Sequence, residues 1–375
     1  MESAQTLLII DDDAALAFGL AAALECDGRR IVVCREIESA QLVVERESVT
    51  DILTDVKLTG RFRFEGLDFV DFAKRHRPDA RVVLMSGDSA EGLSVEAKKR
   101  GAVAFLSKPF DVADIERLLP IPPSGSGTSV VSVPTLSEII RDGEIVPHFQ
   151  PVVALGDGSI HGYESLARLR TPSMLASPDV LFSYAERKHQ LLELETACIA
   201  AAVQHGRRFG QSSRLFVNIH PRCFDEASRI HDTLVEACRR WTVPLDAIVL
   251  EITEQGALSR GKRTLSAFDE LRLDGIRFAF DDVGVAYSHL PLIEQVRPSY
   301  LKISQAFGTG FETDSVRTRL VQNIVSLARD FSCSVVLEGV ESVQTADAAR
   351  DLGIAYAQGY FFGRPCVADR YALAG

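Results

Sequence analysis

The chain of 375 residues has no apolar run of the roughly 18–20 residues that a membrane-spanning helix needs. Its start also lacks the basic residues and the longer apolar core of a secretory signal, because Glu2 precedes only a short apolar run and three aspartates. We therefore expect a cytoplasmic protein that does not insert into a membrane.

An excess of positive charge is missing as well. Lys and Arg total 41 against 52 Asp and Glu, which gives a formal net charge of −11. Proteins that bind nucleic acid broadly neutralise many phosphates with basic residues, so direct DNA binding is not expected. An anionic substrate would have to be held by local basic groups or by bound cations.

The seven cysteines lack any paired spacing. They are scattered along the chain and none belongs to a CxxC motif. We therefore expect neither a structural zinc site nor a disulfide framework. Reduced thiols agree with a cytoplasmic location.

One segment is rich in the residues that interrupt secondary structure. Positions 120–134 read PIPPSGSGTSVVSVP, with prolines that cannot donate backbone hydrogen bonds and little apolar area to bury. We expect a first domain at residues 1–120, a linker at 121–134 and a second domain at 135–375.

The first 120 residues alternate short apolar runs with longer amphipathic stretches. The runs are Leu7–Ile10, Ile31–Val33, Ile52–Thr54, Val82–Met85 and Ala104–Leu106. Continuously apolar strands that alternate with helices predict a doubly wound, five-stranded parallel sheet covered on both faces. Ligands of such sheets bind at the carboxyl ends of the strands.

Polar side chains follow four of these runs. Asp11–Asp13 come after the first, Asp55 after the third, Ser86 after the fourth and Lys108 after the fifth. Carboxylates that converge without a partner repel one another, which a Mg²⁺ ion among them would relieve. Lys108 and Ser86 could then hold the oxygens of a phosphoryl group on Asp55. Each of these residues alone is more easily explained as a helix cap or a turn.

Residues 5–119 resemble the receiver domain of two-component response regulators, a flavodoxin-like fold. The matching motifs are IIDDD at 9–13, TDVKL at 54–58, MSGD at 85–88 and FLSKPF at 105–110. The resemblance implies that Asp55 accepts phosphate from a cognate sensor histidine kinase. It further implies a single Mg²⁺ or Mn²⁺ ion bound by Asp11, Asp12 and Asp55, and a switch formed by Ser86, Phe105 and Lys108.

The second part of the chain begins with a predicted β-hairpin. His148–Leu155 and Ser159–Ser165 flank the turn residues Gly156-Asp157-Gly158. Further strands are predicted at Leu215–Ile219, Ile248–Ile252, Arg277–Phe280, Tyr300–Ile303, Val335–Leu337 and around Tyr356–Phe362, with helices in most intervals. Six or more strand–helix units in about 240 residues predict a modified (β/α)8 TIM barrel with one antiparallel strand.

Polar residues again gather at predicted strand ends. They are Glu164, Asn218, Glu251, Glu254, Asp281, Asp282, Lys302, Glu338, Glu341 and Gln358. In a barrel these ends open on one face. Several carboxylates around one mouth require positive charge, and two Mg²⁺ or Mn²⁺ ions would supply it and suit phosphodiester hydrolysis. Taken singly, each residue could be an ordinary turn or strand end.

About residues 136–370 resemble the EAL-type cyclic-di-GMP phosphodiesterases. The motifs are FQPVV at 149–153, ESLAR at 164–168, VNIHP at 217–221, LEITE at 250–254, FDDVG at 280–284, LKI at 301–303, LEGVE at 337–341 and QGYFFGRP at 358–365. Members of this family cut one phosphodiester of cyclic-di-GMP with water and release linear pGpG.

The resemblance implies a role for each matching residue. Glu164, Asn218, Glu251 and Asp281 would hold one metal ion, and Asp281, Asp282 and Glu338 the second. Glu338 would be the general base and Lys302 would orient water or phosphate. Gln150, Arg168 and Gln358 would contact the substrate, while Glu254 and Glu341 would support the loops around the ligands.

Two departures from the family pattern leave an alternative open. Residues 281–290 read DDVGVAYSHL where members usually have DDFGTGYSSL, and Ser304 replaces an aspartate. The leading hypothesis is a phosphorylation-controlled phosphodiesterase that forms a homodimer or higher oligomer. The alternative is a catalytically weak or inactive domain that acts as a cyclic-di-GMP receptor and signals through protein contacts. The sequence does not set whether phosphorylation activates or inhibits.

Overall fold

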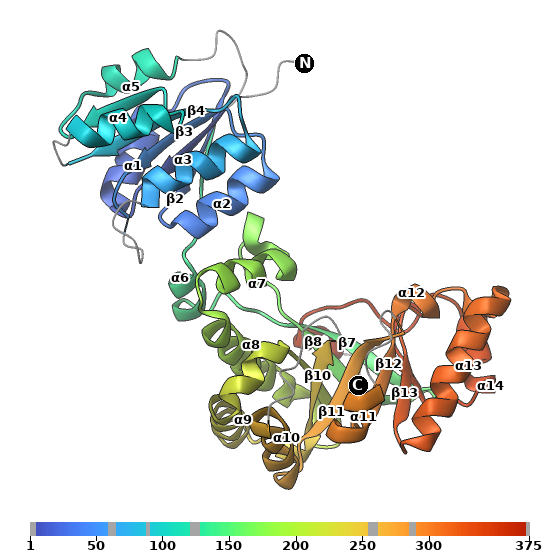
Figure 1. Ribbon diagram of the computed structural model, residues 1–375. Helices are drawn as coiled ribbons and strands as arrows, with labels where there is room; N and C mark the ends of the chain where they lie inside the picture. Colours follow the sequence, from blue (N-terminus) through green and yellow to red (C-terminus); the bar gives the residue numbers. More distant parts are fainter. Residues whose placement is uncertain are drawn as a thin grey trace. The chain divides into compact units, whose positions relative to one another are not determined.

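The computed structural model describes residues 5–58, 65–87, 91–120, 128–253, 262–284 and 290–372 (Figure 1). Its contacts divide the chain into two compact units. One contains Met1–Gly143 and Thr171–His189, and the other contains Glu144–Arg170 and Gln190–Gly375. Within the described residues, no helix is both long and apolar enough to cross a bilayer.

The first unit is built around a parallel sheet. Its strands are β1 (Gln5–Ile10), β2 (Arg29–Cys34), β3 (Asp51–Asp55), β4 (Arg81–Ser86), β5 (Ala104–Ser107) and β6 (Ser129–Ser132), in the order β5-β4-β3-β1-β2-β6. All neighbouring strands in the sheet are parallel. The helices of this unit are α1 (Ala14–Ala23), α2 (Ile37–Arg46), α3 (Glu65–His76), α4 (Glu91–Lys99), α5 (Val112–Leu118), α6 (Leu136–Arg141) and α7 (Pro178–Arg187). The predicted doubly wound parallel fold is confirmed.

The central strands form because their apolar side chains are buried on both faces. Leu7–Ile10 of β1 are completely buried, and so are Ile52 and Leu53 of β3. Helix α1 follows β1 directly because the Asp13 carboxylate accepts the N–H groups of Ala15 and Leu16 and caps the helix. This short connection fixes the aspartates of residues 11–13 at the carboxyl edge of the sheet.

Strand β6 lies inside the segment that the sequence predicts as a linker. It pairs in parallel with β2 and adds a sixth strand to the five that were expected. All four of its residues are exposed, Val130 and Val131 included. Because it buries no side chain, the pattern of apolar residues that reveals the other strands gives little signal here.

The second unit is a closed barrel. Its strands are β7 (His148–Ala154), β8 (Ile160–Leu166), β9 (Arg214–Ile219), β10 (Ile248–Thr253), β11 (Arg277–Val283), β12 (Tyr300–Ile303), β13 (Ser334–Leu337) and β14 (Tyr356–Ala357). The helices are α8 (Leu191–Gly206), α9 (Ala227–Trp241), α10 (Lys262–Leu273), α11 (Leu290–Val296), α12 (Gln305–Gly308), α13 (Ser315–Asp330), α14 (Val343–Asp351) and α15 (Ala368–Ala372). Strand β7 runs antiparallel to both of its neighbours, whereas the other pairs are parallel. The predicted TIM barrel with one antiparallel strand is confirmed.

The last barrel strand is shorter than predicted. It ends at Ala357, and Gln358 begins a loop. This loop packs tightly on the chain after β13, because a Cβ atom on Gly359 would lie 2.1 Å from the carbonyl oxygen of Val340. Only glycine permits this approach, which brings Gln358 close to the end of β13.

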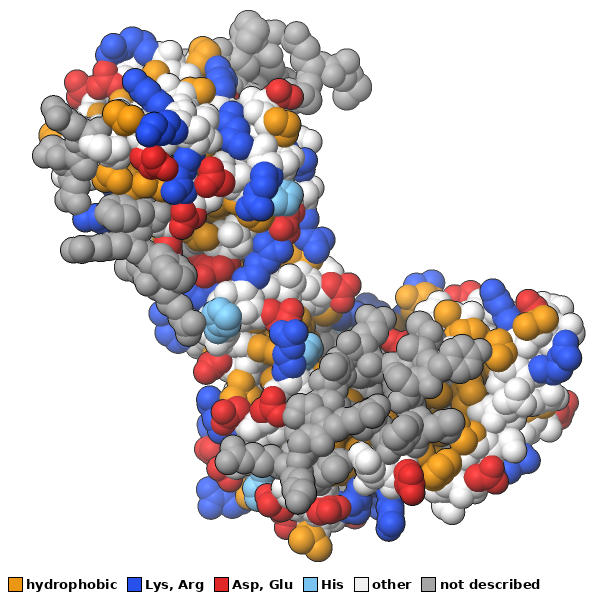
Figure 2. Space-filling view, viewed as in Figure 1, with side chains coloured by type: hydrophobic (Ala, Val, Ile, Leu, Met, Phe, Trp, Pro, Cys, Tyr) orange, Lys and Arg blue, Asp and Glu red, His pale blue; other side chains and the backbone are white. Residues whose placement is uncertain are grey.

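The surface carries side chains of both charges. On the face shown in Figure 2, basic and acidic side chains are interspersed rather than gathered by sign.

Candidate active site

The carboxyl end of the barrel carries a cluster of acids around one lysine. Nζ of Lys302 lies 3.1 Å from Glu164, 2.9 Å from Glu251, 3.3 Å from Asp281 and 2.9 Å from Glu338. Each group comes from a different strand or from the residue that follows one. The side chain of Lys302 is completely buried, and so is that of Glu251, whereas Asp281 and Glu338 are 13% and 18% exposed.

Strand register explains why these groups meet. Glu251 of β10 pairs with Asn218 of β9, and Asp281 of β11 pairs with Thr253 near the end of β10. Asn218 Nδ2 donates to Glu164 Oε1 at 3.0 Å. The structure thus brings together the residues that the sequence predicted at separate strand ends.

Burial and the single ammonium set the protonation of the cluster. Burial raises the pKa of Glu338 to about 8 and holds the pKa of Glu251 well above its usual range. Burial opposes the charged form of Glu164 too, but Lys302 and the hydrogen bonds from Gln358 and Asn218 hold its pKa below the ordinary value. The pKa of Lys302 is raised well above its usual range because the surrounding carboxylates outweigh its burial.

The donor set fits divalent cations. Four carboxylates face one ammonium, so ionisation of all four would leave three negative charges uncompensated. Glu251 is fully buried, and neither of its carboxylate oxygens accepts a hydrogen bond from a described residue. Its Oε1 does form an ion pair with Lys302 Nζ. Buried carboxylates of this kind need a cation or a proton. Carboxylate oxygens and the Asn218 amide are ligands that Mg²⁺ and Mn²⁺ accept.

Asp282 stands in an unusual backbone conformation beside the cluster. Its φ is 57°, and the pairing of β11 with β12 shifts register between Phe280 and Val283. Its N–H group donates to Asp281 Oδ1 at 3.0 Å. Left-handed backbone is uncommon for residues other than glycine and often marks functional sites.

The residues predicted to contact substrate lie next to these acids. Gln358 Nε2 donates to Gln150 Oε1 at 2.9 Å and to Glu164 Oε2 at 2.7 Å. Gln150, Glu164, Arg168, Glu338, Glu341, Gln358 and Tyr360 all help to line one cavity of about 210 Å³. Of the four clustered carboxylates, Glu164 and Glu338 face this cavity. Glu254 lies outside the described residues, as do positions 285–289 of the altered loop.

One buried acid in this unit is not among the site residues predicted from the sequence. Glu195 of α8 is 2% exposed, and its Oε1 accepts the N–H of His220 at 2.6 Å, two residues after Asn218. Burial raises the pKa of Glu195 to about 8. The sequence does indicate its burial. With 3.6 residues per turn, Glu195 shares a helical face with Ile199 and Ala202, and this face points toward the core.

The residues predicted to form a phosphoacceptor site also lie close together. Carboxylate oxygens of Asp11, Asp12 and Asp55 lie within 4.8 Å of one another. Lys108 Nζ lies 3.0 Å from Asp11 and 2.9 Å from Asp55. Burial raises the pKa of Asp11. Burial opposes the charge of Lys108, but its hydrogen bonds to Asp55 and Asp11 raise its pKa above the ordinary value.

Ser86 and Phe105, the two residues predicted to form a switch, lie on neighbouring strands. Ser86 ends β4 and is almost completely buried, whereas Phe105 of β5 is half-buried. Phe105 pairs with Leu84 and Ser86 pairs with Ser107. The sheet therefore holds both residues near the carboxyl edge that carries Asp55.

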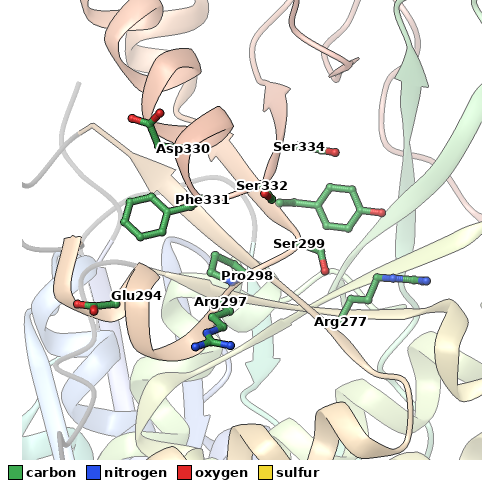
Figure 3. Close-up of a pocket in the computed structure, with 10 residues that line it drawn as sticks. Arg277, Glu294, Arg297, Pro298, Ser299, Asp330, Phe331, Ser332 and Ser334 are labelled. Atoms are coloured by element: carbon green, nitrogen blue, oxygen red, sulfur yellow. The ribbon is translucent and has the colours of Figure 1, made fainter.

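A larger cavity of about 640 Å³ lies at the other ends of the barrel strands (Figure 3). Arg277 and Ser334 begin β11 and β13, and both line it. Its rim mixes Arg297 with Glu294 and Asp330, so it has no clear preference for charge. It contains none of the predicted site residues.

Comparisons with known proteins assign a family to each of the two parts of the chain. A family model described as the EAL domain matches residues 134–365, more than half of the chain. A second model, the response regulator receiver domain, matches residues 7–119.

Two similar proteins are named as a cyclic di-GMP phosphodiesterase and a probable one. The cyclic di-GMP phosphodiesterase RocR of Pseudomonas aeruginosa is 29% identical over 243 residues, which cover 63% of this chain and 62% of RocR. The probable cyclic di-GMP phosphodiesterase PdeG of Escherichia coli is 30% identical over 241 residues, covering 61% of this chain and 46% of PdeG. The match thus spans about half to two thirds of the length of these relatives.

A solved structure is similar over the same region. The PaMucR phosphodiesterase in its c-di-GMP complex superposes with a TM-score of 0.57 and is 26% identical, covering 63% of this chain and 97% of the other. The fold of this part of the chain is therefore shared with this structure.

Proposed function

Because the chain belongs to the EAL domain family and carries a response regulator receiver domain before the EAL domain, we propose that it hydrolyses cyclic di-GMP to linear pGpG under the control of Asp55 phosphorylation. The names of its relatives support the substrate. The observation that carries the proposal is the convergence of four carboxylates on buried Lys302 at the mouth of the barrel.

The proposal assigns metal ligands by position in the cluster. Glu164, Asn218, Glu251 and Asp281 would hold one Mg²⁺ or Mn²⁺ ion, and Asp281, Asp282 and Glu338 would hold a second. When bound, these ions would supply the positive charge that lowers the pKa of a water molecule and stabilises the phosphate oxygens.

Glu338 is proposed as the base that accepts the proton of the attacking water. Its side chain is 18% exposed, so it reaches the cavity, whereas Glu251 is completely buried. Its raised pKa reflects burial and repulsion by other acids, and added positive charge nearby would favour the carboxylate that a base requires. Lys302 would hold Glu338 in position and orient the water or the phosphate.

The remaining residues would select and place the dinucleotide. Gln150 and Gln358 hydrogen-bond each other and line the cavity, and Arg168 adds a cation for a phosphate. Glu341 lines the same cavity and would support the loop after β13. Glu254 keeps its proposed role in supporting the loop that follows Asp282.

The direct test is chromatography of nucleotide products from the purified full chain with Mg²⁺ or Mn²⁺. We expect pGpG from cyclic di-GMP and no product from Glu164→Gln, which keeps the side-chain shape but removes the charge. The matched control is Glu236→Gln, at an exposed position of α9 in the same unit. Intact cyclic di-GMP after long incubation of the wild type would refute the enzymatic proposal.

The receptor alternative is favoured by one feature of the described site. Ser304 replaces a family aspartate and is 6% exposed directly after β12. It provides no charge beside Lys302. Calorimetry together with product analysis separates the two functions, since tight binding without pGpG would indicate a receptor.

The phosphorylation signal requires a donor and a readout. We propose a sensor histidine kinase as the donor, with one Mg²⁺ or Mn²⁺ held by Asp11, Asp12 and Asp55. Phosphate on Asp55 would engage Lys108 and draw in Ser86 and Phe105. A cytoplasmic location and assembly into a homodimer or higher oligomer complete the proposal.

A further inference from the structure

Helix α7 lies within the EAL domain match but packs in the unit that contains the receiver sheet. The EAL domain match begins at residue 134 and therefore includes α6 and α7. The contacts of the structure instead place Thr171–His189 in the unit that contains the receiver sheet. Both ends of this segment continue through the backbone into the barrel unit.

The contacts that hold α7 are specific and largely shielded from solvent. Tyr184 is completely buried, and its hydroxyl donates to the Glu36 carboxylate. Lys188 Nζ lies 2.9 Å from the other oxygen of Glu36. Arg187 Nη2 donates to both oxygens of Glu45 on α2, at 2.8 and 3.0 Å.

Helix α6 is held in the same way. Glu138 forms an ion pair with Arg35, which lowers the pKa of Glu138 to about 2. These pairs have side chains that are less than a third exposed. They are therefore screened less than surface pairs, which contribute little to stability.

The anchor of α7 lies at the phosphoacceptor edge of the sheet. Arg35 and Glu36 directly follow β2, and the carbonyl of Cys34 accepts the N–H of Asp11 at 3.2 Å. Asp11 is one of the three carboxylates around the phosphoacceptor position. The Asp55 carboxylate lies beside that of Asp11, and one backbone hydrogen bond joins Asp11 to Cys34, two residues before Glu36.

The chain on either side of α7 leads to the proposed catalytic residues. Strand β8, which carries Glu164, precedes it, and α8, which carries Glu195, follows it. Glu195 in turn holds the backbone after Asn218. A displacement of α7 therefore reaches Glu164 through the backbone that precedes the helix. It reaches Asn218 through the backbone that follows the helix and the hydrogen bond of Glu195.

We propose that α7 is the element through which the receiver controls the barrel site, with Glu36 and Glu45 as its points of attachment. This inference rests on the proposed function and adds its route of regulation. Phosphorylation would bias the loop after β2 between two arrangements, and α7 would follow it. This route runs through the segment after β2 and does not involve β5 or α4.

Charge reversal across the Arg187–Glu45 pair tests the proposal. The variants are Arg187→Glu, Glu45→Arg and the double exchange, with hydrolysis of cyclic di-GMP measured with and without beryllofluoride as phosphoryl mimic. We expect beryllofluoride to change the wild-type rate about fivefold or more. Each single variant should reduce this ratio to less than about twofold, and the double exchange should restore it.

The matched control is Arg100→Gln, at the residue directly after α4, which removes ion pairs with Asp68, Asp71 and Glu96 within the same unit. It should leave the response unchanged. A wild type that ignores beryllofluoride, single variants with the full response, or loss of the response only in Arg100→Gln would each overturn the inference.

Failure of the proposed function gives a different result. If the wild type did not hydrolyse cyclic di-GMP, the coupling would be measured as the change in beryllofluoride affinity on adding the dinucleotide, because coupling between binding sites is reciprocal. An affinity change that is lost in Arg187→Glu and restored in the double exchange would support α7 as the route. An affinity that does not respond to the dinucleotide would overturn it.

Discussion

Nζ of Lys302 lies 2.9 Å from Oε1 of Glu251, and neither side chain is accessible to solvent. The same ammonium lies within 3.3 Å of three further carboxylates. Without a metal ion, this lysine is the cation that lets the acids remain close together. The cluster is therefore a structural element of the barrel as well as a proposed catalytic one.

Replacing this lysine should make the stability of the chain depend on metal. In Lys302→Met the acids lose their buried cation, and removing one partner of such a pair costs about 3–5 kcal/mol. We expect a lower unfolding temperature in chelator, recovered in part by excess Mn²⁺, together with loss of hydrolysis. Differential scanning fluorimetry with and without Mn²⁺ measures the effect.

The exposed Lys98→Met on α4 serves as the control and should match the wild type in both conditions. If Lys302→Met were as stable as the wild type in chelator, the lysine would not be balancing the acids.

A tight backbone contact under Glu338 gives a second prediction. A Cβ atom on Gly308 would lie 2.1 Å from the carbonyl oxygen of Glu338. Gly308→Ala must therefore displace this backbone and, with it, the proposed base. We expect a fall in kcat of about tenfold or more and a loss of about 1–3 kcal/mol in stability.

Gly156→Ala in the turn between β7 and β8 is the matched control, because no atom lies within 4 Å of its added Cβ. Steady-state kinetics and urea unfolding compare the two variants. Equal kcat values would mean that the position of Glu338 does not limit turnover.

Glu195 predicts a specific dependence of stability on pH. Its pKa is about 8 in the folded chain against an ordinary 4.5. The folded state therefore holds a proton that the unfolded state releases. The stabilisation is complete below about pH 4.5 and is lost as pH rises through about 8, with a slope of up to about 1.4 kcal/mol per pH unit.

Urea unfolding of wild type and Glu195→Gln between pH 5 and 9 isolates this contribution. The wild type should lose stability relative to the variant as pH rises. Glu193→Gln, on the solvent-accessible side of the same helix, should follow the wild type. Parallel profiles for wild type and Glu195→Gln would contradict the assignment.

The phosphoacceptor assignment makes the fourth prediction. Asp55→Asn keeps the shape of the side chain but cannot form the acyl phosphate, so a small phosphodonor should no longer change hydrolysis. Mass spectrometry should show one phosphate fewer than in the treated wild type. Asp13→Asn, which alters the cap of α1, is the control. A response that persists in Asp55→Asn would place the phosphate elsewhere.

The sequence was most informative where an apolar strand ends in a polar residue. Glu164, Glu251 and Asp281 could be placed on one face because parallel strands share their carboxyl edge. The central position of Lys302 among them could not, because it depends on barrel closure and on the register of β12. The metal and substrate roles of these residues stay predictions.

Strand β6 and the packing partner of helix α7 could not be predicted from the sequence, and each for a physical reason. Strand β6 has only exposed side chains, so no apolar alternation reveals it. Helix α7 shows an ordinary amphipathic pattern, which predicts a buried face without naming its partner. Tyr184 meets Glu36 across 148 positions of sequence, and local patterns contain no information on such a contact.

The packing of α7 also bears on how this protein can be divided. A fragment cut at the start of the EAL match would keep Tyr184 but discard the helix that covers it. Such a truncation would leave Tyr184, Arg187 and Lys188 without the acids Glu36 and Glu45 that they contact in the full chain. Domain exchange with other regulators should therefore transplant α2 together with α7, so that recombination respects the packing unit instead of the homology boundary.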